Sequence, residues 1–188
     1  MKKAASIFLR SEITKRDVLS MSRWMQNPDV TRFLNEHVSI SGALQTMAET
    51  TPEPMLAMRL NRDARFYIVS LHSGEPIGYV SLRPVREEGE REIVVVIGEE
   101  SLWGHGCGAH AIRLALAECF LRREMQTHRL IATIHRENAR SIRLFTHAGF
   151  SRVEEAGACL RFSLSREAFF SRSNAAHGTQ SAAHDAAW

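Results

Sequence analysis

One segment limits the possible folds more than any other: residues 92–109 read EIVVVIGEESLWGHGCGA. Its first half is a run of apolar, mostly β-branched residues, which is typical of a buried strand. Its second half carries Gly104, Gly106 and Gly108 ahead of an apolar stretch with helical periodicity. Glycines let the main chain approach a ligand, and a helix that begins there presents unpaired N–H groups at the positive end of its dipole. The segment therefore predicts a strand, a loop and a helix whose N-terminus binds an anion such as a pyrophosphate.

The length and the cysteines indicate one domain in a reducing compartment. A chain of 188 residues can bury about 70% of the surface that its unfolded form exposes, without a metal or disulfide. Cys107, Cys119 and Cys159 form no C-x-x-C pair, so we expect free thiols and a cytoplasmic location. Charged residues between 10 and 16 interrupt any apolar signal sequence, and no apolar run approaches transmembrane length. We therefore expect no membrane association.

The charge pattern favours a small anionic ligand over a nucleic acid. The net charge is +3 and the isoelectric point is about 9.0, but the basic residues are scattered among nearly as many acidic ones. The nine histidines show no metal-ligand spacing, so we expect no metal site. The tail 171–188 has no apolar periodicity and is predicted to be disordered.

Hydrophobic periodicity and turn residues predict the remaining elements. Strands are expected at 6–13, 66–71, 77–84, 91–98, 130–134, 151–153 and 159–164, and helices at 17–25, 29–34, 41–49, 54–60, 106–123 and 138–147. The three consecutive strands before residue 98 are predicted to be antiparallel, whereas the helix that follows crosses to an adjacent parallel strand. The sum is a single α+β domain over 5–170, with a mixed, mostly antiparallel central sheet flanked by helices.

Two motifs and the order of elements resemble the GNAT N-acetyltransferase superfamily, whose members bind acetyl-CoA and acetylate primary amines. The family's pyrophosphate loop, Gln/Arg-x-x-Gly-x-Gly/Ala, corresponds here to WGHGCG at 103–108, with Trp103 in the first position. The family's pattern Asn-x-x-Ser/Ala-x-x-Leu-Tyr/Phe-x-x-x-Gly-Phe corresponds to NARSIRLFTHAGF at 138–150. With RWMQNPDVTRFL at 23–34, the resemblance spans roughly 9–169 and points to the branch that includes ribosomal-protein N-terminal acetyltransferases and small-amine acetyltransferases.

The resemblance implies acetyl-CoA as the acyl-donor cosubstrate and a direct attack by a bound amine. It places the pantetheine arm along the main chain of Val96, Ile97 and Gly98. It places the pyrophosphate at the six residues Gly104, His105, Gly106, Cys107, Gly108 and Ala109. Asn138 either bonds to the pantetheine or caps its own helix. The implied acceptor carries an amine: a peptide N-terminus, an aminoglycoside, a polyamine or an amino-acid derivative. The resemblance leaves a homodimer open.

The catalytic residues are less defined than the cofactor loop. An alkyl amine has a pKa of about 10.4, so its attack needs a base. Glu92 matches the place where some family members carry their catalytic glutamate, although it could instead pair with Arg91 or Arg65. The tyrosine that serves many members as an acid is Phe145 here. Either Ser141 donates a proton to the departing thiolate, directly or through water, or the thiolate leaves without a dedicated acid.

Other polar residues have two interpretations each. Cys107 lies between loop glycines, where a helix N-terminus could lower its pKa, or it is only a small loop residue. The acceptor cleft is expected among the helices between Asp29 and Leu60, where Glu36, Glu49 and Glu53 either attract a cationic acceptor or are solvated helix charges. Glu99 and Glu100 are interpreted as solvated loop charges.

Two other functions fit part of the sequence. Gly104-x-Gly106-x-x-Ala109 also matches a dinucleotide-binding fingerprint of a Rossmann-type NAD enzyme, but these glycines do not follow the strand directly and no acidic residue ends the next strand. A non-catalytic module that binds acyl-CoA would keep the loop and lose the chemistry, which Phe145 leaves open.

Overall fold

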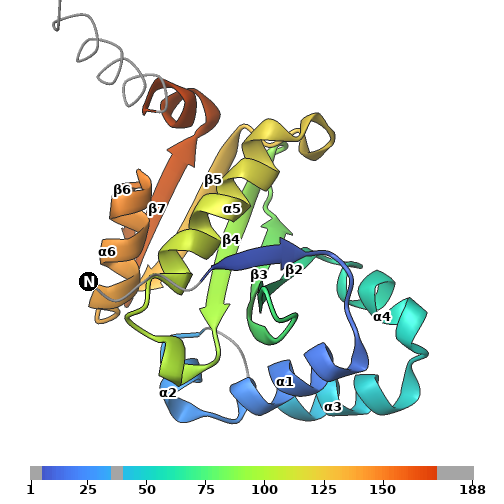
Figure 1. Cartoon of the computed structure of the whole chain (residues 1–188). Coiled ribbons are helices and arrows are strands. Elements are labelled where there is room, and N and C mark those ends of the chain that lie inside the picture. Colours follow the sequence, from blue (N-terminus) through green and yellow to red (C-terminus); the bar gives the residue numbers. More distant parts are fainter. Residues whose placement is uncertain (1–5, 35–39, 173–188) are drawn as a thin grey trace, which may run out of the picture.

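The computed structural model describes residues 6–34 and 40–172, and its elements follow the predicted order (Figure 1). The strands are β1 (Ile7–Arg10), β2 (Arg65–Leu71), β3 (Pro76–Pro84), β4 (Glu90–Ile97), β5 (Arg129–His135), β6 (Ser151–Ala156) and β7 (Cys159–Ser165). The α-helices are α1 (Lys15–Met25), α2 (Pro28–Thr31), α3 (Ile40–Thr50), α4 (Glu53–Leu60), α5 (Cys107–Leu121) and α6 (Ala139–Ala148). Short 3-10 turns lie at η1 (Glu100–Leu102) and η2 (Arg123–Met125), and a further helix covers 166–172.

The strands form one mixed sheet in the order β1-β2-β3-β4-β5-β7-β6. Adjacent strands in this sheet are antiparallel, except β4 and β5, which are parallel. A parallel pair needs a crossover, and α5 provides it across one face of the sheet (Figure 1). The predicted α+β class and the mostly antiparallel sheet are confirmed.

The apolar side chains divide between the two faces of the sheet because strand residues alternate. On β2, Tyr67 and Val69 belong to a core with α5 and α6, whereas Ile68 between them belongs to a second core with α1, α3 and α4. Val18, Met21 and Trp24 of α1 are at most 3% exposed in that second core, as their helical spacing predicts.

Strands β4 and β5 separate along their length. Their pairing covers only Glu90↔Arg129 to Glu92↔Ile131, although β4 stays paired with β3 as far as Ile97. From there β5 continues beside β7. Within the described residues, one edge of β4 from 93 to 97 therefore faces an opening in place of a neighbouring strand.

The structure differs from the prediction in two boundaries near the N-terminus and in one helix near the C-terminal end of the described residues. The first strand ends at Arg10, before 13, because the chain turns at Thr14, which caps α1. Helix α2 ends at Thr31, before 34, since Leu34 N donates to Thr31 O in a tighter turn. The helix at 166–172 was not expected, and Phe169 in it packs on Phe120 with ring centroids 5.3 Å apart. Beyond residue 172 the predicted disordered tail lies outside the described residues.

None of the helices within 6–34 and 40–172 combines the length and apolar character that crossing a bilayer requires. In the same ranges, no group of three or more His, Cys, Asp or Glu side chains is placed to hold a metal ion.

Candidate active site

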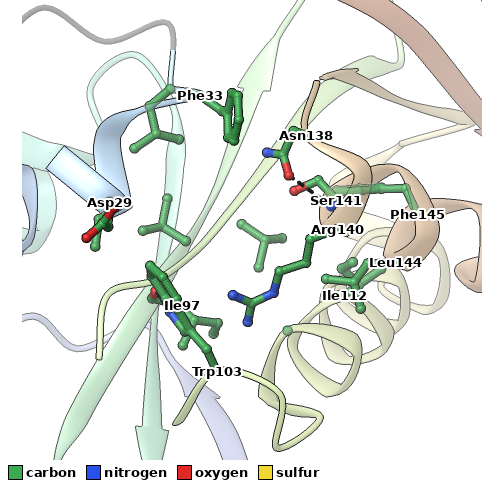
Figure 2. A pocket seen from close by; sticks show the side chains of 15 residues that line it. Asp29, Phe33, Ile97, Trp103, Ile112, Asn138, Arg140, Ser141, Leu144 and Phe145 are labelled. Carbon is green, nitrogen blue, oxygen red and sulfur yellow. Dashed lines mark hydrogen bonds between the residues drawn. The ribbon is translucent and has the colours of Figure 1, made fainter. Parts of the chain in front are cut away.

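A cleft of about 230 Å³ lies where β4 separates from β5 (Figure 2). Its walls come from α2 and the turn after it, the end of β4, the loop before α5, and the first turns of α5 and α6. The lining residues are Asp29, Val30, Phe33, Leu34, Val95, Val96, Ile97, Trp103, Gly108, Ile112, Asn138, Arg140, Ser141, Leu144 and Phe145.

Helix α5 begins at this cleft, and no side chain of the described residues caps its N-terminus. Gly106 is the N-cap residue with φ of 81°, a left-handed conformation that glycine adopts without steric cost, and no side chain caps the helix. His110 N donates to Gly106 O at 3.0 Å, so the N–H groups of Cys107, Gly108 and Ala109 precede the first intrahelical bond. These donors and the helix dipole have the arrangement that the predicted anion site requires, and anion binding there remains a prediction.

Of the predicted phosphate-loop residues, Gly108 lines the cleft, and the other five lie on the loop and first helical turn beside it. A Cβ at Gly108 would lie 3.3 Å from Leu144 Cδ1, so the residue lets α5 and α6 approach closely. His105 Nδ1 lies 3.1 Å from Trp103 O. Cys107 is 2% exposed, and burial raises the pKa of its thiol, which favours the packing interpretation over a reactive thiolate.

The end of β4 presents two of its three predicted residues to the cleft. Val96 and Ile97 line it, and Ile97 O accepts a hydrogen bond from Trp103 Nε1 at 2.7 Å. Gly98 has a different part: its N–H donates to Ile77 O at 2.8 Å, and a Cβ there would meet the Trp24 ring at 2.2 Å. Gly98 is thus required for packing, and its N–H is already paired.

The interpretation as solvated loop charges holds for Glu100, which is exposed, but not for Glu99, which is partly buried and paired. Glu99 Oε1 accepts from Arg23 Nη2 at 2.6 Å and from Trp24 Nε1 at 2.8 Å. Glu100 accepts from the Asn27 side chain. The two carboxylates connect the loop after β4 to the end of α1, a contact between segments about 75 residues apart.

The first turn of α6 places three polar side chains at the cleft (Figure 2). Asn138 Oδ1 accepts from Ser141 N at 3.1 Å, so Asn138 caps the helix while its side chain also lines the cleft. Ser141 lines the same wall. Phe145 is 6% exposed and packs edge-on against Phe150, so the position of the family's tyrosine is apolar. Arg140 extends toward Trp103.

Glu92 lies on β4 opposite Arg83 and beside Ile131, and it is not among the lining residues. It shares a strand face with Val94 and Val96, on the side of α1 and α3. Its two predicted ion-pair partners are engaged elsewhere: Arg91 Nε donates to Thr127 Oγ1 at 3.2 Å, and Arg65 lies over the Tyr67 ring. The role of Glu92 as the catalytic base remains a prediction.

One wall of the cleft is formed by α2 and the turn after it, within the range 29–60 in which the sequence places the acceptor cleft, although sequence reasoning did not single out the residues that line it. Asp29, Val30, Phe33 and Leu34 line it, and Asp29 is exposed. The available signal was Asn27-Pro28-Asp29, in which Asn27 Oδ1 accepts from Asp29 N at 2.9 Å and starts α2. The acidic residues that were considered lie elsewhere: Glu49 pairs with Gln45, Glu53 accepts from Lys15 N, and Glu36 lies outside the described residues.

The comparison with protein families agrees with this geometry. Residues 7–151 match the family described as an acetyltransferase (GNAT) domain, so the chain belongs to the GNAT acetyltransferase family. It is therefore an acyltransferase that uses acetyl-CoA as the acyl donor. A search among curated proteins gives no match to this sequence.

Solved structures show the same fold at low sequence identity. The acetyltransferase (GNAT family) from Bacillus anthracis is 19% identical with a TM-score of 0.68, over 88% of this chain and 98% of its own. The aminoglycoside acetyltransferase AAC(6')-Ib, solved with coenzyme A and kanamycin, is 21% identical with a TM-score of 0.67, over 87% and 97%. Spermidine N-acetyltransferase from Vibrio cholerae, solved with CoA and spermine, is 16% identical with a TM-score of 0.70, over 87% and 98%.

The family assignment overturns both rival interpretations of the sequence. A Rossmann-type NAD enzyme would have a largely parallel sheet, whereas β4 and β5 are the one parallel pair among the described strands. The interpretation as a non-catalytic module is rejected, because the chain belongs to a family of acetyltransferases.

Proposed function

We propose that this acyltransferase moves the acetyl group from acetyl-CoA to a primary amine by direct attack in a ternary complex. One observation carries the proposal: a single cleft joins the bare N-terminus of α5 at Gly108, the end of β4, and the carboxylate of Asp29. The two ends differ in charge, because helix dipole and orphan N–H groups attract an anion and Asp29 attracts a cation. An anionic donor and an ammonium acceptor would meet between them.

The donor would be held mainly by the main chain. The N–H groups at the start of α5 bind the pyrophosphate, and the open edge of β4 at Val96 and Ile97 lies beside the pantetheine. Asn138 adds an amide from α6 while it caps that helix. The surrounding Ile112, Leu144 and Phe145 are apolar and suit the uncharged part of the arm.

In the reaction, the amine nitrogen attacks the thioester carbonyl, the C–N bond forms, the C–S bond breaks, and the thiolate leaves. Glu92 is the proposed base that takes the amine proton. It precedes Val96 by four residues, about 13 Å along an extended strand, so the proton would travel through water. Ser141 is the proposed donor to the thiolate, since Phe145 cannot donate.

The acceptor class is tested by acetylation of an amine panel with mass detection of the product. The panel contains peptides with free N-termini, an aminoglycoside, a polyamine and amino-acid derivatives. We expect at least one amine to gain a single acetyl group together with stoichiometric thiol release. Thiol release with no acetylated amine from any class would contradict the proposal.

Glu92→Gln tests the base on the amine that the panel identifies. We expect kcat to fall about 100-fold, as for loss of a general base, with partial recovery at higher pH where the amine is already deprotonated. Glu88→Gln is the matched control, because Glu88 is an exposed carboxylate in the turn before β4. An unchanged kcat in Glu92→Gln would remove Glu92 from the reaction.

A further inference from the structure

We propose that Arg140 binds the pyrophosphate of the acyl donor, and that Trp103 is the platform that holds its guanidinium in place. The inference deepens the proposed function and rests on it. It adds a side-chain cation from α6 to a phosphate site that otherwise consists of main-chain N–H groups from α5.

Two contacts fix this pair across the mouth of the cleft. Trp103 Nε1 donates to Ile97 O at 2.7 Å, which ties the indole to the end of β4. The guanidinium carbon of Arg140 lies 4.9 Å from the centroid of the same ring, within the range of a cation–π interaction. Figure 2 shows the side chain reaching from α6 toward the β4 side, and both residues line the cleft.

The position of this cation is electrostatically unfavourable unless an anion joins it. Arg140 and Cys107 are near enough to affect each other's ionisation, so the guanidinium lies close to the first turn of α5. A helix N-terminus is positive, and a cation there is the reverse of the stabilising arrangement. No Asp or Glu within 6–34 and 40–172 forms an ion pair with Arg140, and the residue is exposed, so its guanidinium is open to a ligand.

The chemistry of the group fits a phosphate. A guanidinium offers paired N–H donors that match two phosphate oxygens, and it keeps its faces free to stack on an aromatic ring. Stacking on Trp103 therefore leaves the N–H edge available to a ligand. The pyrophosphate is the anionic part of acetyl-CoA that the bare N–H groups of Cys107, Gly108 and Ala109 would place nearest to this edge.

The test measures binding by titration calorimetry with three ligands and no acceptor. Coenzyme A carries the pyrophosphate and the 3′-phosphate, dephospho-CoA lacks only the 3′-phosphate, and pantetheine lacks both of these groups and the adenosine. The variants are Arg140→Ala, Arg140→Lys and Trp103→Leu. Arg143→Ala is the matched control, because Arg143 is an exposed arginine on the same helix that does not line the cleft.

We expect Arg140→Ala to weaken coenzyme A and dephospho-CoA equally, by about 10- to 100-fold, with pantetheine and the control unchanged. Arg140→Lys should recover part of the loss, and Trp103→Leu should produce part of it. Affinity within twofold of the wild type in Arg140→Ala would overturn the proposal. A loss seen with coenzyme A but not with dephospho-CoA would assign Arg140 to the 3′-phosphate and overturn it too.

These results are separable from the proposed function. If the wild type acetylates no amine in the panel, the proposed function fails. The measured affinities still show whether Arg140 binds the pyrophosphate. Acetyl transfer from a short acetyl thioester without pyrophosphate should be equal in Arg140→Ala and the wild type. A variant that also loses this transfer would point to a damaged fold and contradict a specific phosphate contact.

Discussion

The N-termini of α1 and α5 are built in opposite ways. At α1, Thr14 N donates to Asp17 Oδ2 at 2.7 Å and Asp17 N donates to Thr14 Oγ1 at 3.3 Å, which is a capping box. The carboxylate also accepts from Arg10 Nη1 at 2.8 Å and is 1% exposed. At α5, Gly106 supplies no cap, and the nearby charge is the cation of Arg140.

The difference separates a helix end that the protein itself satisfies from one that is left open for the proposed ligand. The carboxylate of Asp17 caps the N-terminus of α1 and binds Arg10 at the end of β1. This helix end therefore stabilises the junction between the first strand and the first helix. The end of α5 has its dipole and N–H groups unsatisfied beside a cleft, so an external anion gains the interaction that Asp17 supplies in α1. If the proposed donor binds there, it supplies the stabilisation that α5 lacks in the free protein.

The largest expected effect is on stability when the cap of α1 is removed. Asp17→Ala should lower the free energy of unfolding by about 3–5 kcal/mol, because it leaves the largely buried Arg10 without its partner. Arg16→Ala is the control, since it breaks only the exposed pair with Glu75 and should cost less than about 1 kcal/mol. Urea denaturation measures both. A cost for Asp17→Ala as small as that for Arg16→Ala would show that the two helix ends do not differ in this way.

The next effect is on ligand affinity at the bare end of α5. Gly106→Glu should weaken coenzyme A binding at least about 100-fold, because it places a carboxylate where the phosphates bind and strains a residue with φ of 81°. Gly106→Gln carries the same strain without the charge, and Gly74→Glu repeats a positive φ, 85°, in the hairpin between β2 and β3. Calorimetry should rank Gly106→Glu weakest, Gly106→Gln between, and Gly74→Glu equal to the wild type. Unchanged affinity in Gly106→Glu would place the phosphate elsewhere.

Acidification should reproduce part of the Asp17 effect. Burial raises the pKa of Asp17, but hydrogen bonds from Arg10 and Thr14 outweigh it, so the net pKa is lowered. The stabilisation is therefore fully present above the unfolded value of about 3.9 and is lost as the pH falls through the lower folded value. We expect the difference in unfolding free energy between the wild type and Asp17→Asn to shrink between pH 5 and pH 2. A difference that grows on acidification would reverse the sign of the argument.

The smallest effect concerns α6. Its N-terminus has one side-chain cap from Asn138, whereas α1 has a capping box and α5 has no side-chain cap. Asn138→Ala should cost about 1 kcal/mol of stability because it removes the bond to Ser141 N, whereas Asn138→Ser keeps a capping oxygen and should cost less than half of that. Thermal unfolding measures both variants, and coenzyme A affinity is measured in parallel. If the serine variant keeps stability but loses affinity, the amide of Asn138 contacts the donor in addition to capping the helix.

Much of the fold could be predicted because its signals are local. The strand and helix patterns placed α1, α5 and α6 within about two residues of their observed bounds, and the turn at 72–75 placed the β2–β3 hairpin. The end of β1 was wrong because Thr14 caps a helix, and that contact competes with strand pairing. The helix at 166–172 was missed since it is stabilised by Phe169 against Phe120, a contact across the domain.

The site was predictable only in part, for the same reason. The loop glycines and Asn138 could be identified from sequence motifs. The structure brings Gly108, Val96, Ile97, Asn138 and Ser141 to one cleft. The motif could not show that Gly98 serves the packing of Trp24, or that Glu99 holds the end of α1. Nor could it single out Asp29 within the expected acceptor region at 29–60 or place Arg140 in the cleft, since these side chains reach it from separate elements.

From the sequence alone followed the strand, the glycine loop, the helix with an uncapped N-terminus, and the family that this combination resembles, because periodicity, turn residues and capping act between near neighbours. The tertiary structure alone decided how far β4 and β5 stay together, and which side chains enter the gap between them. Those contacts join residues far apart in the chain, such as Trp103 and Arg140, and their geometry depends on how both faces of the sheet are packed.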